Sequence, residues 1–156
     1  MKMVFRMLPL VLLGFVLGAP GAEAQAYGSL GLGAAKPFGD FKDVADLGVT
    51  FRGQAGLRLW IFDAHLQTGA TTFTAADDVS DSDDDNRTIY HAGAGARLGF
   101  SSLWVGANAA YFFGDGEKGI GFFPEVGVKI WRIEIVGDVR IDGDEKWAAA
   151  RIGYRF

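Results

Sequence analysis

WAAARIGYRF, residues Trp147 to Phe156, alternates between two kinds of side chain. In an extended chain, one face would carry Ala148, Ala150, Ile152, Tyr154 and Phe156, and the other would carry Trp147, Ala149, Arg151, Gly153 and Arg155. Because successive side chains of a β-strand point to opposite sides, this segment predicts a strand with one apolar and one cationic face. In a water-soluble sandwich the apolar face would cover the core, whereas in a membrane it would face lipid.

The first 24 residues have the three parts of a secretory signal peptide. Lys2 and Arg6 give a positively charged beginning, and residues 7–16 are almost entirely apolar. Ala22-Glu23-Ala24 then has the small residues of a cleavage site. The apolar run is shorter than the ~20 residues that a membrane-spanning helix needs. We therefore interpret residues 1–24 as a signal peptide and residues 25–156 as one domain.

Charge and cysteine content narrow the class of protein. The net charge is −4, and it becomes −5 in the mature chain because the leader contains two cations and one anion. An acidic balance argues against a nucleic-acid partner. With no cysteine, an exported domain of this size needs a large core or a closed membrane barrel for stability.

Period-two alternation predicts eight strands in the mature chain. They cover residues 26–34, 47–59, 64–74, 87–100, 103–113, 120–130, 133–141 and 147–156. Residues 36–43 are expected to form a polar loop, and Pro124 is expected to lie at a bulge or a rim position. Polar, mostly acidic loops alternate with tight turns beside Trp or Phe, as an outer-membrane barrel requires. Nearly every strand reaches the ~9–11 residues that cross the hydrocarbon layer.

Aromatic residues gather where two membrane interfaces would lie. Near the tight turns are Trp60, Phe62, Phe100, Trp131, Tyr154 and Phe156, and near the loops are Tyr90, Tyr111, Phe113 and Phe122. Rings with an apolar body and a polar edge suit such interfaces. The architectural alternative is a soluble sandwich or a lipocalin-like barrel with these rings in its core.

Charged residues take the face opposite to the apolar one. The predicted lumen set is Arg52, Arg58, Arg97, Glu125, Lys129, Glu134, Asp138, Arg140, Arg151 and Arg155. Eight strands enclose an interior just wide enough for side chains, and buried charges must be paired. The sequence therefore predicts an all-β, eight-stranded antiparallel up-and-down transmembrane β-barrel with an ionic lumen network, in which lumen-facing glycines leave room for the arginines.

These features resemble the small eight-stranded outer-membrane barrels of the OmpA/OmpX type across the whole mature segment. The resemblance implies residence in the cell outer membrane, contact with its lipid and lipopolysaccharide, and insertion by the barrel-assembly machinery. Ile152, Tyr154 and Phe156 match the C-terminal pattern that this machinery reads in such proteins. We expect a monomer without a cofactor.

The remaining candidates for chemistry are incomplete. Asp81, Asp83 and Asp85 have the spacing of the first calcium-loop ligands, but Asn86 replaces the turn glycine and Ala92 the closing glutamate. We interpret the segment as a solvated acidic loop that is at most a weak metal candidate.

Three functions follow from these features, and the first is favoured. It is a non-enzymatic role in envelope structure or surface interaction. A narrow ion-conducting pore past Glu125, Lys129, Glu134 and Asp138 is the alternative. A lipid-modifying enzyme would need Ser29 to meet His65 or His91 in space.

Overall fold

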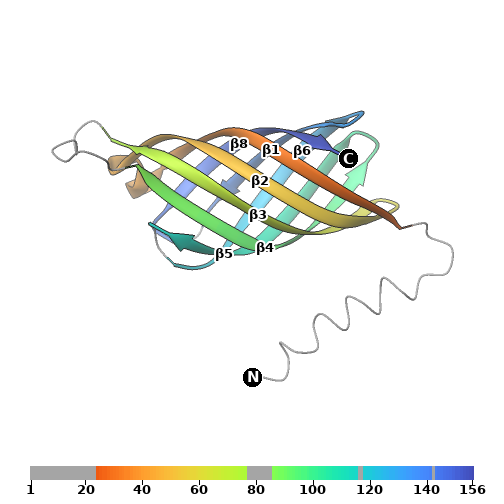
Figure 1. Cartoon of the computed structure of the whole chain (residues 1–156), viewed down its shortest axis with the longest axis horizontal. Coiled ribbons are helices and arrows are strands. Elements are labelled where there is room, and N and C mark those ends of the chain that lie inside the picture. The colour runs from red at the N-terminus through yellow and green to blue at the C-terminus, as the bar shows by residue number, and fades with distance from the viewer. Residues whose placement is uncertain (1–23, 77–85, 116–117, 142) are drawn as a thin grey trace, which may run out of the picture.

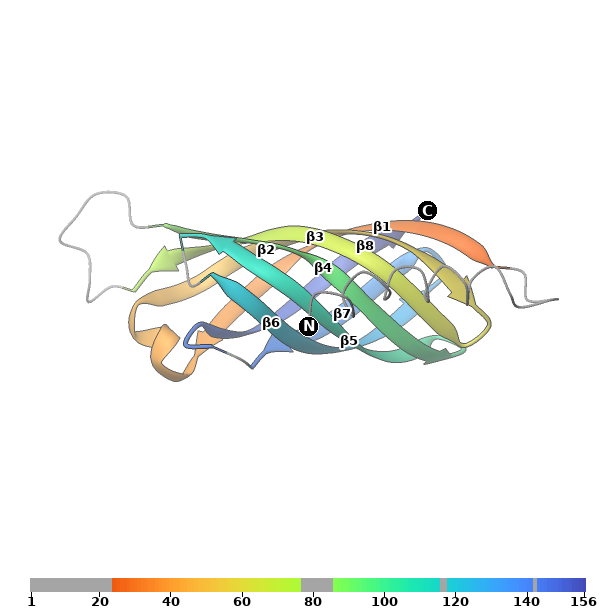
Figure 2. The same ribbon diagram turned by 90° about the horizontal axis from the view of Figure 1, so that it is seen from below.

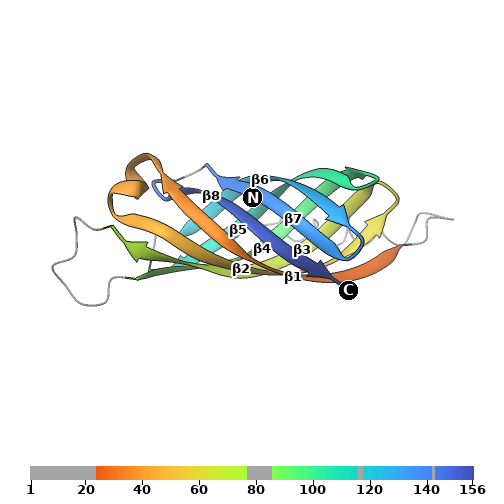
Figure 3. The ribbon, with the colours of Figure 1, turned by 90° about the horizontal axis from the view of Figure 1, so that it is seen from above.

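The computed structural model describes residues 24–76, 86–115, 118–141 and 143–156, which form a closed barrel (Figure 1). Its strands are β1 (Gln25–Phe38), β2 (Ala45–Leu59), β3 (Phe62–Ala75), β4 (Arg87–Phe100), β5 (Leu103–Gly114), β6 (Gly119–Ile130), β7 (Ile133–Arg140) and β8 (Lys146–Arg155). Each strand pairs antiparallel with its neighbours in sequence, and β8 pairs with β1. Figures 2 and 3 show the tilted strands from two further sides. No helix within the described ranges is long and apolar enough to cross a bilayer.

All eight predicted strands are present, and the fourth has the predicted bounds. The expected polar loop over residues 36–43 is wrong in its first part, because β1 continues to Phe38. Lys36 pairs with Ala148 and Phe38 pairs with Lys146, so pairing with β8 keeps β1 extended as far as Phe38. Only residues Gly39–Asp43 leave the wall, as the short 3-10 helix η1.

The three connections 60–61, 101–102 and 131–132 are two-residue turns. Trp60, Ser101 and Trp131, the first residue of each, have φ of 54°, 56° and 58°. This left-handed conformation costs an L-residue roughly 1–2 kcal/mol, and it lets the chain reverse at once. Phe62 and Asp63, which we expected in a turn, therefore already belong to β3, and Asp63 pairs with Arg58.

Of the two positions expected for Pro124, a bulge or the rim, the bulge is absent. The β5–β6 register runs without a shift through the pair Ala107 and Pro124. The β6–β7 ladder pairs six residues of each strand and begins at Glu125, immediately after the proline. It is the shortest of the eight ladders. A residue without an N–H is tolerated where a ladder ends, so no bulge is needed.

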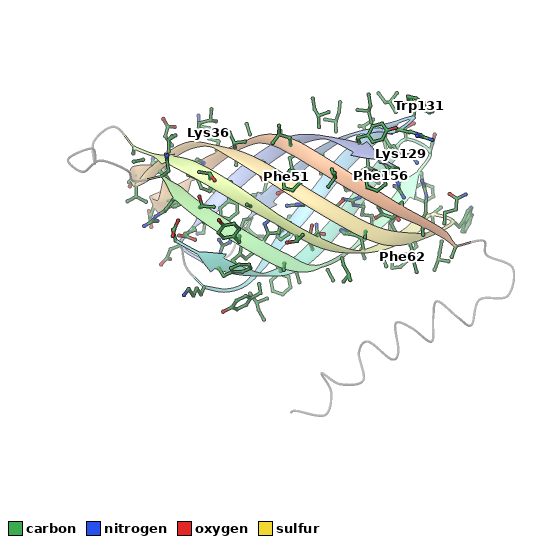
Figure 4. The ribbon with its side chains drawn as sticks, viewed as in Figure 1. Lys36, Phe51, Phe62, Lys129, Trp131 and Phe156 are labelled. Carbon is green, nitrogen blue, oxygen red and sulfur yellow. The ribbon has the colours of Figure 1, made fainter. Side chains whose placement is uncertain are left out.

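The outer surface of the barrel is apolar. The ten aromatic residues predicted for the interfaces are all exposed, and Trp60 and Trp131 are 83% and 80% exposed. Figure 4 labels Phe51, Phe62, Trp131 and Phe156, four exposed aromatic residues of this outer face. Monomeric water-soluble proteins rarely carry continuous apolar surface on this scale. The rings therefore form the outside of a membrane barrel and not the core of a sandwich.

Candidate functional site

Two layers of side chains fill the lumen. The layer at the loop end is a buried hydrophobic cluster of Ala35, Phe41, Ala45, Phe73, Ile89, Ala110, Phe112, Phe123, Trp147 and Ala149, which we call the aromatic layer. The rest of the lumen, toward the two-residue turns, is mostly polar and charged. The lumen therefore has two parts with different chemistry.

The aromatic layer closes the loop-end mouth of the barrel. Phe41 of η1 is buried, with its ring 5.1 Å from Phe73 and 6.3 Å from Trp147. The Trp147 ring lies 5.8 Å from that of Phe112. Edge-to-face pairs of this kind add to the stabilisation from burial. Sequence reasoning missed this layer, because it assigned Phe41 to a polar loop.

The centre of the lumen is an ionic cluster around two carboxylates. Glu125 accepts from Arg97 Nε at 2.7 Å and from an Arg52 terminal nitrogen at 3.3 Å. Asp138 accepts from the other terminal nitrogen of Arg52 at 3.4 Å and also from Arg151. Arg52 thus joins the two carboxylates across the lumen, and both carboxylates are buried.

Further pairs extend the network toward both ends. On the turn side, Arg155 lies 3.1 Å from Glu134 and 3.5 Å from Asp63. On the loop side, Arg140 lies 3.4 Å from Glu145. Asp63 and Glu145 are absent from the predicted lumen set, because sequence reasoning assigned them to a turn and a hairpin loop. The alternation did indicate their position, because Asp63 is two residues from the lumen-facing His65 and Glu145 is two residues from the lumen-facing Trp147.

Two predicted members lie apart from these pairs. Arg58 donates its Nε to the carbonyl oxygen of Trp60 at 3.2 Å, at the turn end. Lys129 lines a small cavity with Arg58 at the same end. Within the described ranges, neither of them forms an ion pair with a carboxylate. The structure therefore brings together eight of the ten predicted residues.

Aromatic faces cover several of the lumen guanidinium groups. The guanidinium carbon of Arg97 lies 3.9 Å from the centre of the Trp104 ring, and that of Arg155 lies 3.5 Å from that of Tyr27. A planar guanidinium is attracted to the negative face of a ring. The rings thus complete the surroundings of buried cations that the carboxylates cover only in part.

Neutral polar residues connect the charged ones. Gln54 accepts from Arg97 at 2.7 Å and from the Ser29 hydroxyl at 3.3 Å. His65 Nε2 is 2.8 Å from the Asn108 side-chain oxygen. In the described part of the chain, no hydrogen bond joins a serine to His65 or His91. The Ser29 hydroxyl and the His65 ring thus both bind neutral amide side chains of the lumen.

The spaces left in the lumen are small. One has a volume of about 20 Å³ and lies beside Ser29, Arg97 and Glu134, and two others have about 10 Å³ each. A volume on the order of 10–15 Å³ is enough for one water molecule. Cavities of this size suit single waters and not a continuous water column. The metal candidate Asp81, Asp83 and Asp85 lies outside the described residues.

Replacing Gly127 with alanine is expected to destabilise the barrel by about 1–3 kcal/mol through overpacking. A Cβ at this position would contact the Trp104 ring, with its Nε1 at 2.9 Å. Urea unfolding in detergent micelles, followed by tryptophan fluorescence, would measure the change. Gly119→Ala is the matched control, because nothing lies within 4 Å of a Cβ there. Equal unfolding midpoints for the two variants would contradict the packing described.

Comparison with known proteins identifies the fold. No family model and no curated protein sequence matches the chain. Among solved structures, the crystal structure of Neisserial surface protein A is similar with a TM-score of 0.53 and 16% identity, over 85% of this chain and 97% of that one. The Yersinia pestis outer membrane protein Ail in a phospholipid bilayer nanodisc matches with a TM-score of 0.50 and 14% identity, over 85% and 100%. The chain therefore has the fold of the small outer-membrane β-barrels.

Proposed function

We propose that this protein is a non-enzymatic integral protein of the outer membrane, with an envelope-structural or surface-interaction role and a lumen that does not conduct ions. The observation that carries the proposal is the filling of the lumen. Aromatic rings occupy its loop end, paired charges cross its centre, and three spaces between them have volumes of about 10 to 20 Å³.

The arrangement of charges argues against a pore. An ion path needs groups that bind an ion weakly enough to release it. Glu125 and Asp138 are instead held by Arg52, Arg97 and Arg151. An ion that passed this point would have to displace buried guanidinium groups from their carboxylates, which leaves charges unpaired in a low-dielectric interior.

The exterior supports residence in a membrane. An apolar wall that is closed on itself leaves no strand edge to lipid, as a spanning β-structure requires. One of the two similar structures is named a surface protein and the other an outer membrane protein. The proposed partners of this chain are therefore outer-membrane lipid and lipopolysaccharide. The barrel-assembly machinery, reading Ile152, Tyr154 and Phe156, is the proposed partner during biogenesis.

A lipid-modifying activity is not part of the proposal. Such an enzyme needs a nucleophile within hydrogen-bond reach of its base. The hydroxyl of Ser29 donates to Gln54, and His65 is bonded to Asn108. Both candidate groups are thus engaged in the lumen network.

Planar-bilayer recording tests the proposal directly. The purified barrel is expected to give no discrete conductance steps, because its cavities are too small for a water column. Heat-modifiable migration of protein recovered from the same membranes verifies that folded barrels were inserted. Discrete steps from folded, inserted protein would replace the structural role with the narrow pore.

A further inference from the structure

A cavity of about 10 Å³ lies where the aromatic layer meets the ionic network. Its lining combines the rings of Phe112 and Phe123 with three polar residues that matter here, Thr50, Arg52 and His91. These polar residues come from β2 and β4, the two strands that pair with β3. The space is about the size of one water molecule or one small ion.

Two buried polar atoms at this cavity lack hydrogen-bond partners, and His91 Nε2 is a donor in the tautomer that carries its hydrogen there. Among the described residues, Arg52 Nε and His91 Nε2 have no hydrogen-bond partner, although Arg52 is only 6% exposed and His91 only 3%. Thr71 donates its hydroxyl to Thr50 at 3.0 Å, which leaves the Thr50 hydrogen for another acceptor. Buried polar groups in native proteins almost always find a partner. A guanidinium N–H, an imidazole and a hydroxyl are therefore available to one occupant.

The same cavity offers few acceptors. Asp138 is the one carboxylate in its lining. One of its oxygens accepts from Arg52 and the other from Arg151. A water molecule could accept from the free donors, but its own two hydrogens would then have only the Thr71 hydroxyl oxygen, ring surfaces and an engaged carboxylate to face. An anion accepts from every donor and has no hydrogen to place.

The surrounding charge also favours an anion. Arg52, Arg140 and Arg151 lie around this part of the lumen, together with Asp138 at the centre and Glu145 on the loop side. Glu145 also pairs with Arg87 at the loop end. Glu125, the second carboxylate bound by Arg52, also pairs with Arg97, which lies nearer the two-residue turns. In the lining itself, two arginines, Arg52 and Arg140, stand against one carboxylate, Asp138.

We propose that this cavity binds a small monovalent inorganic anion, of which chloride is the probe. The anion accepts from Arg52 Nε, from the Thr50 hydroxyl and from the Nε2–H of a neutral His91 ring. It is enclosed as the barrel closes, because the aromatic layer lies above the cavity and the ionic network below. The proposal is independent of ion conduction, since a trapped anion fills the lumen and does not pass through it.

Stability in matched salts tests the site. The folded protein in detergent is unfolded with urea in chloride or in gluconate at the same ionic strength. Chloride is expected to raise the folding equilibrium constant in proportion to 1 + [Cl⁻]/Kd, about elevenfold at ten times Kd. Thr50→Val should abolish this increment. Ser29→Ala should keep it, because that hydroxyl donates to Gln54 beside a different cavity.

Crystals of the unaltered protein grown in bromide give a second test that does not depend on a variant. An anomalous peak within hydrogen-bond distance of Arg52 Nε and His91 Nε2 is expected. Equal stability in chloride and gluconate, retention of the increment in Thr50→Val, or a cavity without anomalous signal would each overturn the proposal and leave a site for water.

Discussion

Replacing Glu125 with glutamine is expected to lower the free energy of unfolding by about 3–5 kcal/mol, because it breaks a buried ionic cluster from one side. The carboxylate is 4% exposed and accepts from both Arg97 and Arg52. Glutamine keeps the shape of the side chain but removes its charge. Two guanidinium groups then lose a counter-ion in an interior that screens them poorly. Urea unfolding in micelles, followed by tryptophan fluorescence, measures the effect.

The matched control is Asp46→Asn, which removes an exposed carboxylate from β2. Among the described residues Asp46 has no ion-pair partner, so its variant should stay within about 0.5 kcal/mol of the unaltered protein. A Glu125 variant that is as stable as this control would mean that the lumen charges are solvated and that the network does not support the barrel.

Deleting Phe156 is expected to reduce the amount of barrel in the outer membrane to a small fraction of the normal level. Its backbone N–H donates to the carbonyl of Gly28 at 2.9 Å, and its carbonyl accepts from the Gly28 N–H at 3.0 Å. Loss of these two bonds accounts for only about 1–3 kcal/mol of stability. If the assembly machinery reads the terminal ring, biogenesis suffers more than the folded barrel does. Membrane fractionation and urea unfolding of refolded protein measure the two effects separately.

Two substitutions separate the ring from the backbone. Phe156→Ala keeps the pairing with Gly28 and should retain most of the assembly defect. Phe100→Ala removes a ring of similar exposure, 71% against 66%, at the same end of the barrel but away from the closing pair. It should assemble normally. Normal outer-membrane levels of the Phe156 deletion would show that the C-terminus carries no signal.

The division of faces could be predicted from the sequence because alternation directly records it. In β4, Arg97 and His91 are buried while Tyr90 and Phe100 are exposed, as the period of two indicates. The closing pair of β1 and β8 follows from the same reasoning, since a barrel in lipid leaves no free edge. A strand's phase thus assigns each side chain to lipid or lumen.

Phase does not tell how deep in the lumen a residue lies or where a turn begins. Asp63 was missed because the predicted third strand begins at residue 64, whereas the positive φ of Trp60 lets the chain reverse within two residues and places Asp63 in β3. Phe41 was missed because its burial depends on η1 folding over Phe73, a contact between residues far apart in sequence. Arg58 has the lumen phase but lies at the turn end, beyond the carboxylates. The depth of a residue in the lumen depends on how far neighbouring strands are shifted along one another, and the sequence of one strand does not determine that shift.

The short ladder between β6 and β7 affects where neighbouring strands of the wall can separate most easily. The strands that carry the chain ends, β1 and β8, share ten pairs, whereas β6 and β7 share six. Fewer backbone bonds hold the second seam, and Pro124 cannot lengthen it. The mechanically weakest line of the cylinder therefore lies away from the junction at which the chain closes. If two strands of the wall separate, we expect the separation to begin beside Pro124, where the fewest pairs have to break.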